Sequence, residues 1–343
     1  MPHSLSDHPR LWSIILAGNE PSILDPFVKL WQGSYTPKHF CTFAGTRSLL
    51  QHTWDLADQV SHPENRVTVV THPFIQQTCR QFGGRVPGLI ATEPFQKGSL
   101  PSALLGLATV HAQDPHSTVA LYPSRSFIHP ESRFLRTIQR AVWVTKILKD
   151  RMVLLGAHSD FAVGKYGWLR TKEQLGWASG LPVMAIEMSP TAMFPSRTTN
   201  PSSIFPSSST FLNSGIVLTT TEVLWNLCEV LFPGIHDHLE ILGRLTGQPE
   251  KQRQKTSAFQ HLPSGCFWID CLSKMTEHLA MVELQDVSWS DWEDPGHIAD
   301  TLSLIGREPA FPVQWPHDHE GRCAASHRDE AKPLKHGPEN IHN

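Results

Sequence analysis

Trp12-Ser-Ile-Ile-Leu-Ala17 is the first of several short apolar runs that alternate with amphipathic stretches along the first half of the chain. A run that is apolar throughout is typical of a strand buried on both faces, as in a parallel sheet covered by helices. The later runs span residues 66–71, 88–92, 118–121 and 151–156. We predict that all of these runs are strands of one sheet.

Helical patterns lie between these runs. Residues 48–60 place Leu49, Leu50 and Trp54 on one face at helical spacing, and residues 101–112 and 130–149 carry similar stripes. Alternation of buried strands and amphipathic helices is the βαβ rhythm of a doubly wound sheet, whose ligands gather at the carboxyl ends of the strands.

The second half of the chain is less regular. Residues 189–210 are rich in Ser, Thr and Pro, and residues 246–255 are polar, so we expect two mobile connections. After Trp315 the chain is polar and contains many histidines. We therefore expect one domain over residues 11–315 and a disordered tail over 316–343. Further elements are expected as strands at 215–219 and 279–284 and as helices at 222–231, 267–278 and 295–305.

Composition excludes several classes of partner. The chain has 343 residues, 40% of them apolar, with a net charge of −3 and a pI near 6.7. Such a charge provides no field for nucleic acid or an anionic membrane. The apolar run 11–17 is too short for a signal sequence or a membrane span, and the six cysteines form no CxxC pair. We expect a cytoplasmic protein with free thiols and no membrane contact.

The motifs of three common enzyme classes are absent from the sequence. No GxGxxG follows the first apolar run, and the chain contains neither a GxxxxGK[ST] loop nor a GxSxG elbow. These absences count against dinucleotide oxidoreductases, P-loop NTPases and α/β hydrolases.

A set of motifs in a fixed order resembles the mannose-1-phosphate guanylyltransferases. Each motif is weak alone, but the series over residues 11–306 is specific. The matching segments are Ile14-Ile-Leu-Ala-Gly18, Pro37-Lys38-His39-Phe40, Gly45 to Gln51, Glu93-Pro94, Gly98 to Ala103, Tyr122-Pro-Ser124, Tyr166-Gly-Trp168, Ile186-Glu187, Leu212 to Gly215 and Trp289-Ser-Asp291-Trp292.

The resemblance implies a Rossmann-like nucleotidyltransferase fold, an α/β fold with a mixed, mostly parallel central sheet and helices on both faces. It also implies transfer of a nucleotidyl group from GTP to mannose 1-phosphate, giving GDP-mannose and diphosphate with Mg²⁺ as cofactor. The expected partners are thus a nucleotide and a sugar phosphate. The catalytic residues carried over are Lys38 and Asp291, with Asp291 also as metal ligand, and the substrate-binding residues are Gly18, Asn19, Arg125, Tyr166, Gly167, Glu187 and Asn213.

Each of these polar residues also has a structural interpretation. Lys38 is then a solvated charge at a loop end, and Asp291 caps the helix near residue 295 or closes the turn before it. Asn213 and Glu187 are then buried polar residues satisfied by the backbone. Trp289 and Trp292 are expected in the core.

The sequence departs from the family where the chemistry depends on charge. Pro21 replaces a glycine of the phosphate-binding turn, Ile23 replaces its arginine, and Met188 stands near the position of a sugar-phosphate-binding lysine. Arg125 replaces a metal-binding Asp. Coulomb's law puts the repulsion between a guanidinium and Mg²⁺ about 4 Å apart on the order of 8 kcal/mol at an effective dielectric of about 20.

Two hypotheses follow from these departures. In the first, the protein is a working or weak guanylyltransferase that uses Mg²⁺. In the second, it is a noncatalytic relative without a cofactor that binds a nucleotide, a sugar phosphate or a partner subunit, with Arg125 in place of the metal. The sequence leaves both a homo-oligomer and a hetero-oligomer open.

Overall fold

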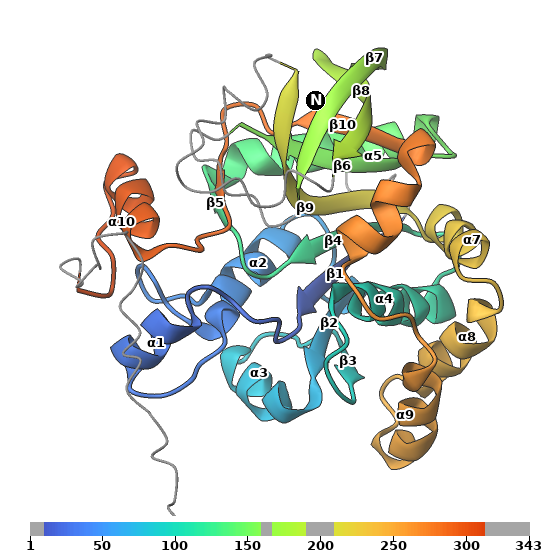
Figure 1. The fold of residues 1–343 in the computed structure, drawn as a ribbon, viewed down its shortest axis with the longest axis horizontal. Helices are drawn as coiled ribbons and strands as arrows, with labels where there is room; N and C mark the ends of the chain where they lie inside the picture. The colour runs from blue at the N-terminus through green and yellow to red at the C-terminus, as the bar shows by residue number, and fades with distance from the viewer. Residues whose placement is uncertain (1–9, 159–166, 190–208, 313–343) are drawn as a thin grey trace, which may run out of the picture.

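A single large sheet organises the molecule. The computed structural model describes residues 10–158, 167–189 and 209–312, and its main sheet has nine strands in the order β3-β2-β1-β4-β9-β6-β10-β8-β7. The expected mixed, mostly parallel sheet with helices on both faces is confirmed (Figure 1). Tyr166, the tail from 316 and most of the connection 189–210 lie outside the described residues.

The predicted strands are present near their expected bounds. One half of the sheet pairs β1 (Leu11–Ala17), β2 (Arg66–Thr71), β3 (Leu89–Glu93) and β4 (Thr118–Pro123) in parallel. The other half contains β9 (Thr210–Thr220), β6 (Met152–Ala157), β10 (Leu279–Glu283), β8 (Leu181–Ser189) and β7 (Trp168–Ala178). Because β9 is antiparallel to both β4 and β6, the sheet is mixed at its centre.

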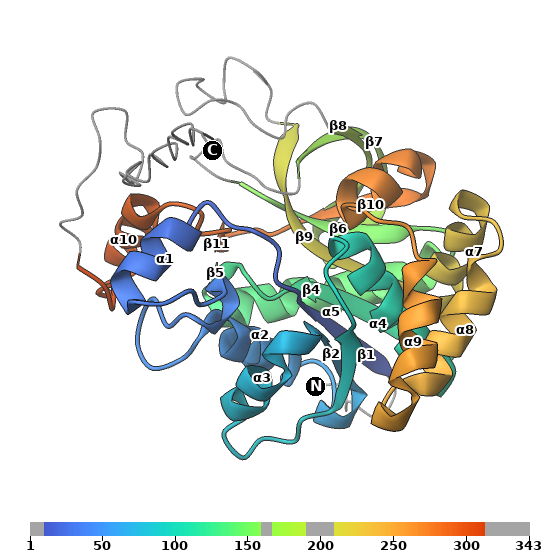
Figure 2. The ribbon, with the colours of Figure 1, turned by 60° about the horizontal axis from the view of Figure 1, so that its bottom comes forward.

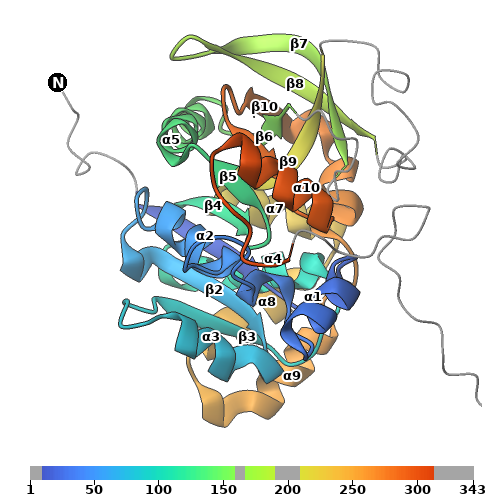
Figure 3. The same cartoon turned by 90° about the vertical axis from the view of Figure 1, so that its left-hand side faces the viewer.

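Helices cover both faces of this sheet. The helix α2 begins at a capping box, in which Ser48 accepts from the Gln51 amide and the Gln51 side chain accepts from the Ser48 amide. Figure 2 and Figure 3 show α2 and α5 on one face, and α4, α7 and α8 on the other. The helices are α1 (Asp25–Gln32), α2 (Leu49–Ala57), α3 (Ile75–Gln81), α4 (Ser99–Gln113), α5 (Glu131–Ile147), α7 (Thr221–Leu231), α8 (Ile235–Leu245), α9 (Gln252–Gln260) and α10 (Pro295–Leu304).

The structure corrects two expectations for the second half. The expected mobile connection 246–255 is wrong, because a 3₁₀ turn (Pro249–Lys251) leads into α9. This helix buries Lys255, Ala258 and Phe259, so its apolar stripe is too sparse to show as periodicity. The expected helix 267–278 is instead a π-helical turn followed by two 3₁₀ turns.

A second, smaller core lies beside the carboxyl ends of the parallel strands. It joins α1, α10 and the two-stranded sheet of β5 (Phe127–His129) and β11 (Ser288–Ser290). Trp292 stacks on Phe127 with ring centroids 4.4 Å apart, and Trp289 is buried in the main core, so both tryptophans are core residues as expected. This packing fixes the chain after β11 against the turn after β1.

Two further expectations concern the surroundings of the protein. Every cysteine that the structure describes is a free thiol, as expected. Within the described ranges, no helix combines the length and apolar character that crossing a membrane requires.

Candidate functional site

The turn after β1 directs its backbone amides into the protein. The amide of Asn19 donates to Thr71 Oγ1 at 3.4 Å, that of Ser22 donates to Asp25 Oδ2 at 3.0 Å, and that of Leu24 donates to Ser22 Oγ at 3.2 Å. A phosphate-binding turn needs these donors to point at the ligand. Here the three amides donate to side-chain oxygens of the protein instead.

Two neighbours reinforce this arrangement. Pro21 has no amide hydrogen to donate, and Ile23 is an exposed apolar side chain in place of an arginine. The Tyr35 hydroxyl donates to Asn19 Oδ1 at 2.7 Å, which fixes the side chain of Asn19. Three amides of the turn are thus engaged within the protein, and its exposed Ile23 carries no charge.

Glu293 lies at the centre of a buried ion-pair cluster, which we define as Lys38, Arg125 and Glu293. Lys38 Nζ lies 2.8 Å from Glu293 Oε1, and Arg125 Nη2 lies 3.7 Å from the same oxygen. Ser22 Oγ donates to Glu293 Oε2 at 2.6 Å. The three residues of the cluster are at most 8% exposed. The two cations therefore share one carboxylate.

The ionisation of the cluster follows from these contacts. Burial alone would raise the pKa of Glu293, but the charges of Lys38 and Arg125 and the hydrogen bonds from Lys38 and Ser22 lower it to about 2. Burial lowers the pKa of Lys38, and the charge of Glu293 opposes this effect. Burial and the Arg125 charge lower the pKa of His39 to about 3, so its ring is neutral at pH 7.

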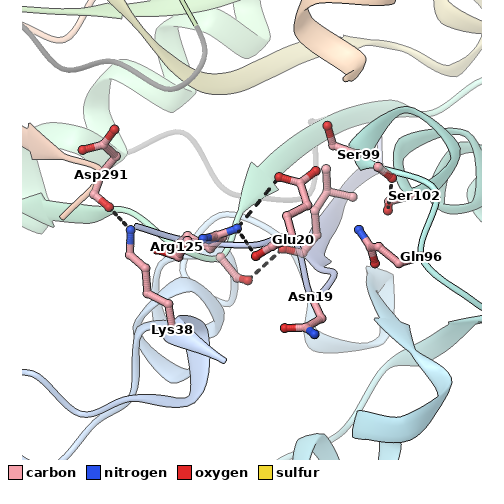
Figure 4. A network of polar contacts seen from close by, with 12 residues as sticks. Asn19, Glu20, Lys38, Gln96, Ser99, Ser102, Arg125 and Asp291 are labelled. Atoms are coloured by element: carbon pink, nitrogen blue, oxygen red, sulfur yellow. Dashed lines mark hydrogen bonds and ion pairs between the residues drawn. The ribbon is translucent and has the colours of Figure 1, made fainter. Parts of the chain in front are cut away.

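Arg125 is held between two carboxylates and one carbonyl. Its Nη1 donates to the Glu20 carbonyl at 3.0 Å and lies 3.9 Å from Glu20 Oε2, as Figure 4 shows. Its Nε and Nη2 are buried and have no hydrogen-bond partner in the described chain. The positive charge of Arg125 is therefore largely neutralised by Glu20 and Glu293. Two nitrogens of its guanidinium remain donors without a hydrogen-bond partner in the described chain.

Figure 4 shows the backbone carbonyl of Asp291 pointing at Lys38 and its carboxylate pointing away, an arrangement that does not fit Mg²⁺. The Asp291 carbonyl accepts a hydrogen bond from Lys38 Nζ, and Arg125 stands where the resemblance implies a carboxylate (Figure 4). Residues 10–158, 167–189 and 209–312 contain no group of three or more His, Cys, Asp or Glu that could hold a metal. Mg²⁺ in phosphoryl-transfer sites is held by one or two carboxylates together with substrate phosphates, and a guanidinium at this position opposes such binding.

A small hollow lies next to Gly18. Its volume is about 20 Å³, and its walls include Gly18, Ser102, Arg125 and Trp268. This volume holds about one water molecule, whereas nucleotide-sized ligands occupy pockets of about 300–1,000 Å³. The hollow by itself is therefore much smaller than a whole nucleotide.

A buried acid, Glu93, lies beside this hollow. Glu93 accepts hydrogen bonds from Ser102 Oγ and, at 3.1 Å, from Thr71 Oγ1. Burial raises the pKa of Glu93 to about 7, against the lowering effect of these hydrogen bonds. Gln96 Nε2, close to Gly18, is a buried donor without a partner among the described residues.

The remaining predicted residues lie outside the ion-pair cluster. Asn213 is fully buried, with its amide donating to the Gly167 carbonyl at 3.0 Å and its Oδ1 accepting from the Gly215 amide at 2.9 Å. Glu187 on β8 pairs with Arg170 on β7 at 2.6 Å, and both side chains are exposed. The expected burial of Asn213 is correct, and that of Glu187 is wrong.

Sequence reasoning missed three residues of this region: Glu293, Glu93 and Gln96. Glu93 lies in a segment that was matched to the family, and Glu293 follows the matched segment ending at Trp292. The signal available was a carboxylate two residues after Asp291, which could have been considered as a counter-ion for Lys38 and Arg125.

Comparison with known proteins supports the fold. No family model matches the chain, and no curated protein matches it. Among solved structures, a mannose-1-phosphate geranyltransferase from Thermus thermophilus superimposes with a TM-score of 0.68 at 15% identity, over 86% of this chain and 79% of that one. A mannose-6-phosphate isomerase from Helicobacter pylori gives 0.60 at 16% identity, over 82% and 99%.

A third structure, an inositol-1-phosphate CTP transferase from T. maritima, gives a TM-score of 0.45 at 12% identity over 82% of this chain and 89% of that one. The superpositions with TM-scores of 0.68 and 0.60 show a common fold, and identities of 15% and 16% leave the substrates open. The chain has a sugar-phosphate nucleotidyltransferase-like fold.

Proposed function

We propose that this protein is a noncatalytic relative of the sugar-phosphate nucleotidyltransferases, in which a structural ion-pair cluster has replaced the metal-dependent corner. The observation that carries the proposal is the position of Glu293 between Lys38 and Arg125. Nucleotidyl transfer needs cations that neutralise the phosphates of the substrate. Here Lys38 and Arg125 both already form ion pairs with the carboxylate of Glu293.

The turn after β1 supports the same proposal. The amides of Asn19, Ser22 and Leu24 are engaged within the protein, and Ile23 stands where the family places its arginine. Each lost interaction of this kind costs a factor of about ten in rate for every 1.4 kcal/mol of transition-state stabilisation. Several such losses together lower the rate by orders of magnitude.

A pyrophosphate-release assay with GTP, mannose 1-phosphate and Mg²⁺ tests the proposal. We expect no release above the enzyme-free background, and calorimetry should show no binding of GTP that depends on Mg²⁺ over EDTA. A competent guanylyltransferase assayed in parallel is the positive control. Release of pyrophosphate in proportion to the concentration of this protein would refute the proposal.

Binding without turnover is a second candidate, and the unsatisfied donors favour it. Arg125 Nε, Arg125 Nη2 and Gln96 Nε2 are buried without hydrogen-bond partners within the described residues, and Arg125 and Gln96 flank the hollow at Gly18. Uncharged oxygens of a nucleoside or a sugar would satisfy them. The test is calorimetry with GDP-mannose in EDTA, where Gln96→Ala should weaken any binding at this hollow, whereas Gln76→Ala on the exposed side of α3 should not.

A further inference from the structure

A second cavity opens between α8 and α9, on the side of the molecule away from α1 and α10 (Figures 1 and 2). Its volume is about 560 Å³, within the range of small-molecule sites. All of its lining residues come from positions 238–261, so it shares none with the hollow at Gly18. We call it the α8–α9 cavity.

Two histidine rings form one wall of the α8–α9 cavity. The rings of His238 and His261 stack with centroids 4.4 Å apart and planes 6° apart. His261 Nδ1 lies 2.8 Å from the Ser257 carbonyl, to which it donates its hydrogen. This contact fixes the tautomer, so Nε2 of His261 accepts a hydrogen bond when the ring is neutral and donates one when it is protonated.

Arg244 supplies a permanent positive charge to the same cavity. No acidic side chain lines the cavity within the described ranges, and Arg244 makes no ion pair with any residue described there. A guanidinium presents a planar fork that matches two oxygens of a phosphate. The cavity therefore places a guanidinium next to two imidazole rings.

The rest of the lining adds amide groups and apolar surface. Gln248 and Gln254 lie at the polar side, while Ile241 and Ala258 contribute apolar contacts. Such a combination suits a ligand with an anionic end and a less polar body. A purely hydrophobic ligand would leave Arg244 unmatched.

We propose that the α8–α9 cavity binds a small phosphate-bearing molecule at a site separate from the hollow at Gly18. Arg244 donates hydrogen bonds to two phosphate oxygens, and the stacked rings of His238 and His261 line the site beside it. The organic part lies against Ile241 and Ala258. This inference stands whether or not the chain catalyses nucleotidyl transfer, because it uses none of the residues of the ion-pair cluster.

Calorimetry on the full chain with inorganic pyrophosphate, without Mg²⁺, tests the proposal. We expect binding by the wild-type protein and at least a tenfold loss of affinity in Arg244→Gln. The matched control is Arg253→Gln, which removes an exposed arginine of α9 that does not line the cavity and should bind as the wild type does. Equal affinities of the two variants would overturn the proposal.

Histidine NMR locates the ligand. Pyrophosphate should shift the ring resonances of His238 and His261 and leave those of exposed His62 unchanged. Binding that leaves His238 and His261 unperturbed would place the anion elsewhere and refute the site. Repeating the titration with mannose 1-phosphate and with GMP shows which organic part raises the affinity. Pyrophosphate release by the Arg244→Gln variant should match that of the wild type, so the two proposals fail independently.

Discussion

Glu293 Oε1 lies 2.8 Å from Lys38 Nζ, and the two side chains are 8% and 1% exposed. Arg125 Nη2 approaches the same oxygen to 3.7 Å. Burial of unmatched charge is costly, so each member of the cluster depends on the others. The cluster thus ties the chain after β11 to the loop that carries Lys38.

Glu293→Gln should lower the free energy of unfolding by about 3 kcal/mol, because removal of one partner leaves a buried charge uncompensated. Urea denaturation at pH 7 measures the change. Glu64→Gln is the control, since the Glu64 side chain is 77% exposed and its loss should change stability by less than about 0.5 kcal/mol. Equal stabilities of the two variants would show that Glu293 does not balance Lys38.

Acid should destabilise the protein through the same carboxylate. The folded pKa of Glu293 is about 2, below its ordinary value of 4.5, so the unfolded chain binds more protons between these two values. Stability is then fully present above about pH 4.5 and is lost as the pH falls toward 2, by on the order of 3 kcal/mol from this group. The difference between wild type and Glu293→Gln should shrink over this window. A constant difference from about pH 5 to about pH 2.5 would contradict the assignment.

Glu93 should show the opposite dependence. Its folded pKa is raised to about 7, so the folded protein binds more protons than the unfolded chain between its ordinary value of 4.5 and 7, and stability falls as the pH rises through that window. Glu93→Gln removes this penalty and should stabilise the protein at pH 8 by up to about 3 kcal/mol. At pH 4.5 the gain should nearly vanish. Thermal unfolding at the two pH values measures it, and a gain independent of pH would point to packing instead.

Arg125→Asp should create dependence on a divalent cation. The substitution removes a positive charge and adds a carboxylate next to Glu20 and Glu293, so the variant should be less stable than the wild type in EDTA and should recover part of its melting temperature with Mg²⁺ or Mn²⁺. Arg125→Asn is the matched control, since it removes the same charge without adding a carboxylate. Identical metal responses of the Asp and Asn variants would argue against this corner as the former metal site.

Close packing of α8 on α4 should be sensitive to one methyl group. A Cβ at Gly243 would lie 2.4 Å from the Ala108 carbonyl oxygen, so Gly243→Ala should destabilise the protein by about 2 kcal/mol despite the better helix propensity of Ala. Gly176→Ala is the control, because a Cβ there meets no heavy atom within 4 Å in the described structure. Denaturant midpoints of the two variants should therefore separate clearly.

Much of the fold could be read from the sequence because its strongest signals are local. The run Trp12 to Ala17 and its relatives are buried on both faces, and this burial makes them continuously apolar. The helix α9 escaped prediction because its buried face consists of little more than Ala258, Phe259 and the aliphatic stem of Lys255.

The charges of the site were harder to predict. Lys38, Arg125 and Asp291 were singled out, and the structure brings them together (Figure 4). The neutralisation of Lys38 by Glu293 depends on a contact between residues 255 positions apart, which has no local signature. A counter-ion of a site can lie anywhere in the chain. The net charge of a site therefore becomes known only when the fold is known.

The shared carboxylate of Glu293 also constrains how such a protein can change. An acidic residue placed at position 125 alone would lie against Glu293, and losing Glu293 alone would leave Lys38 and Arg125 to repel each other. Each single step therefore passes through a less stable intermediate, and a viable route requires paired replacements. The ion-pair cluster therefore opposes the stepwise replacement of its own members.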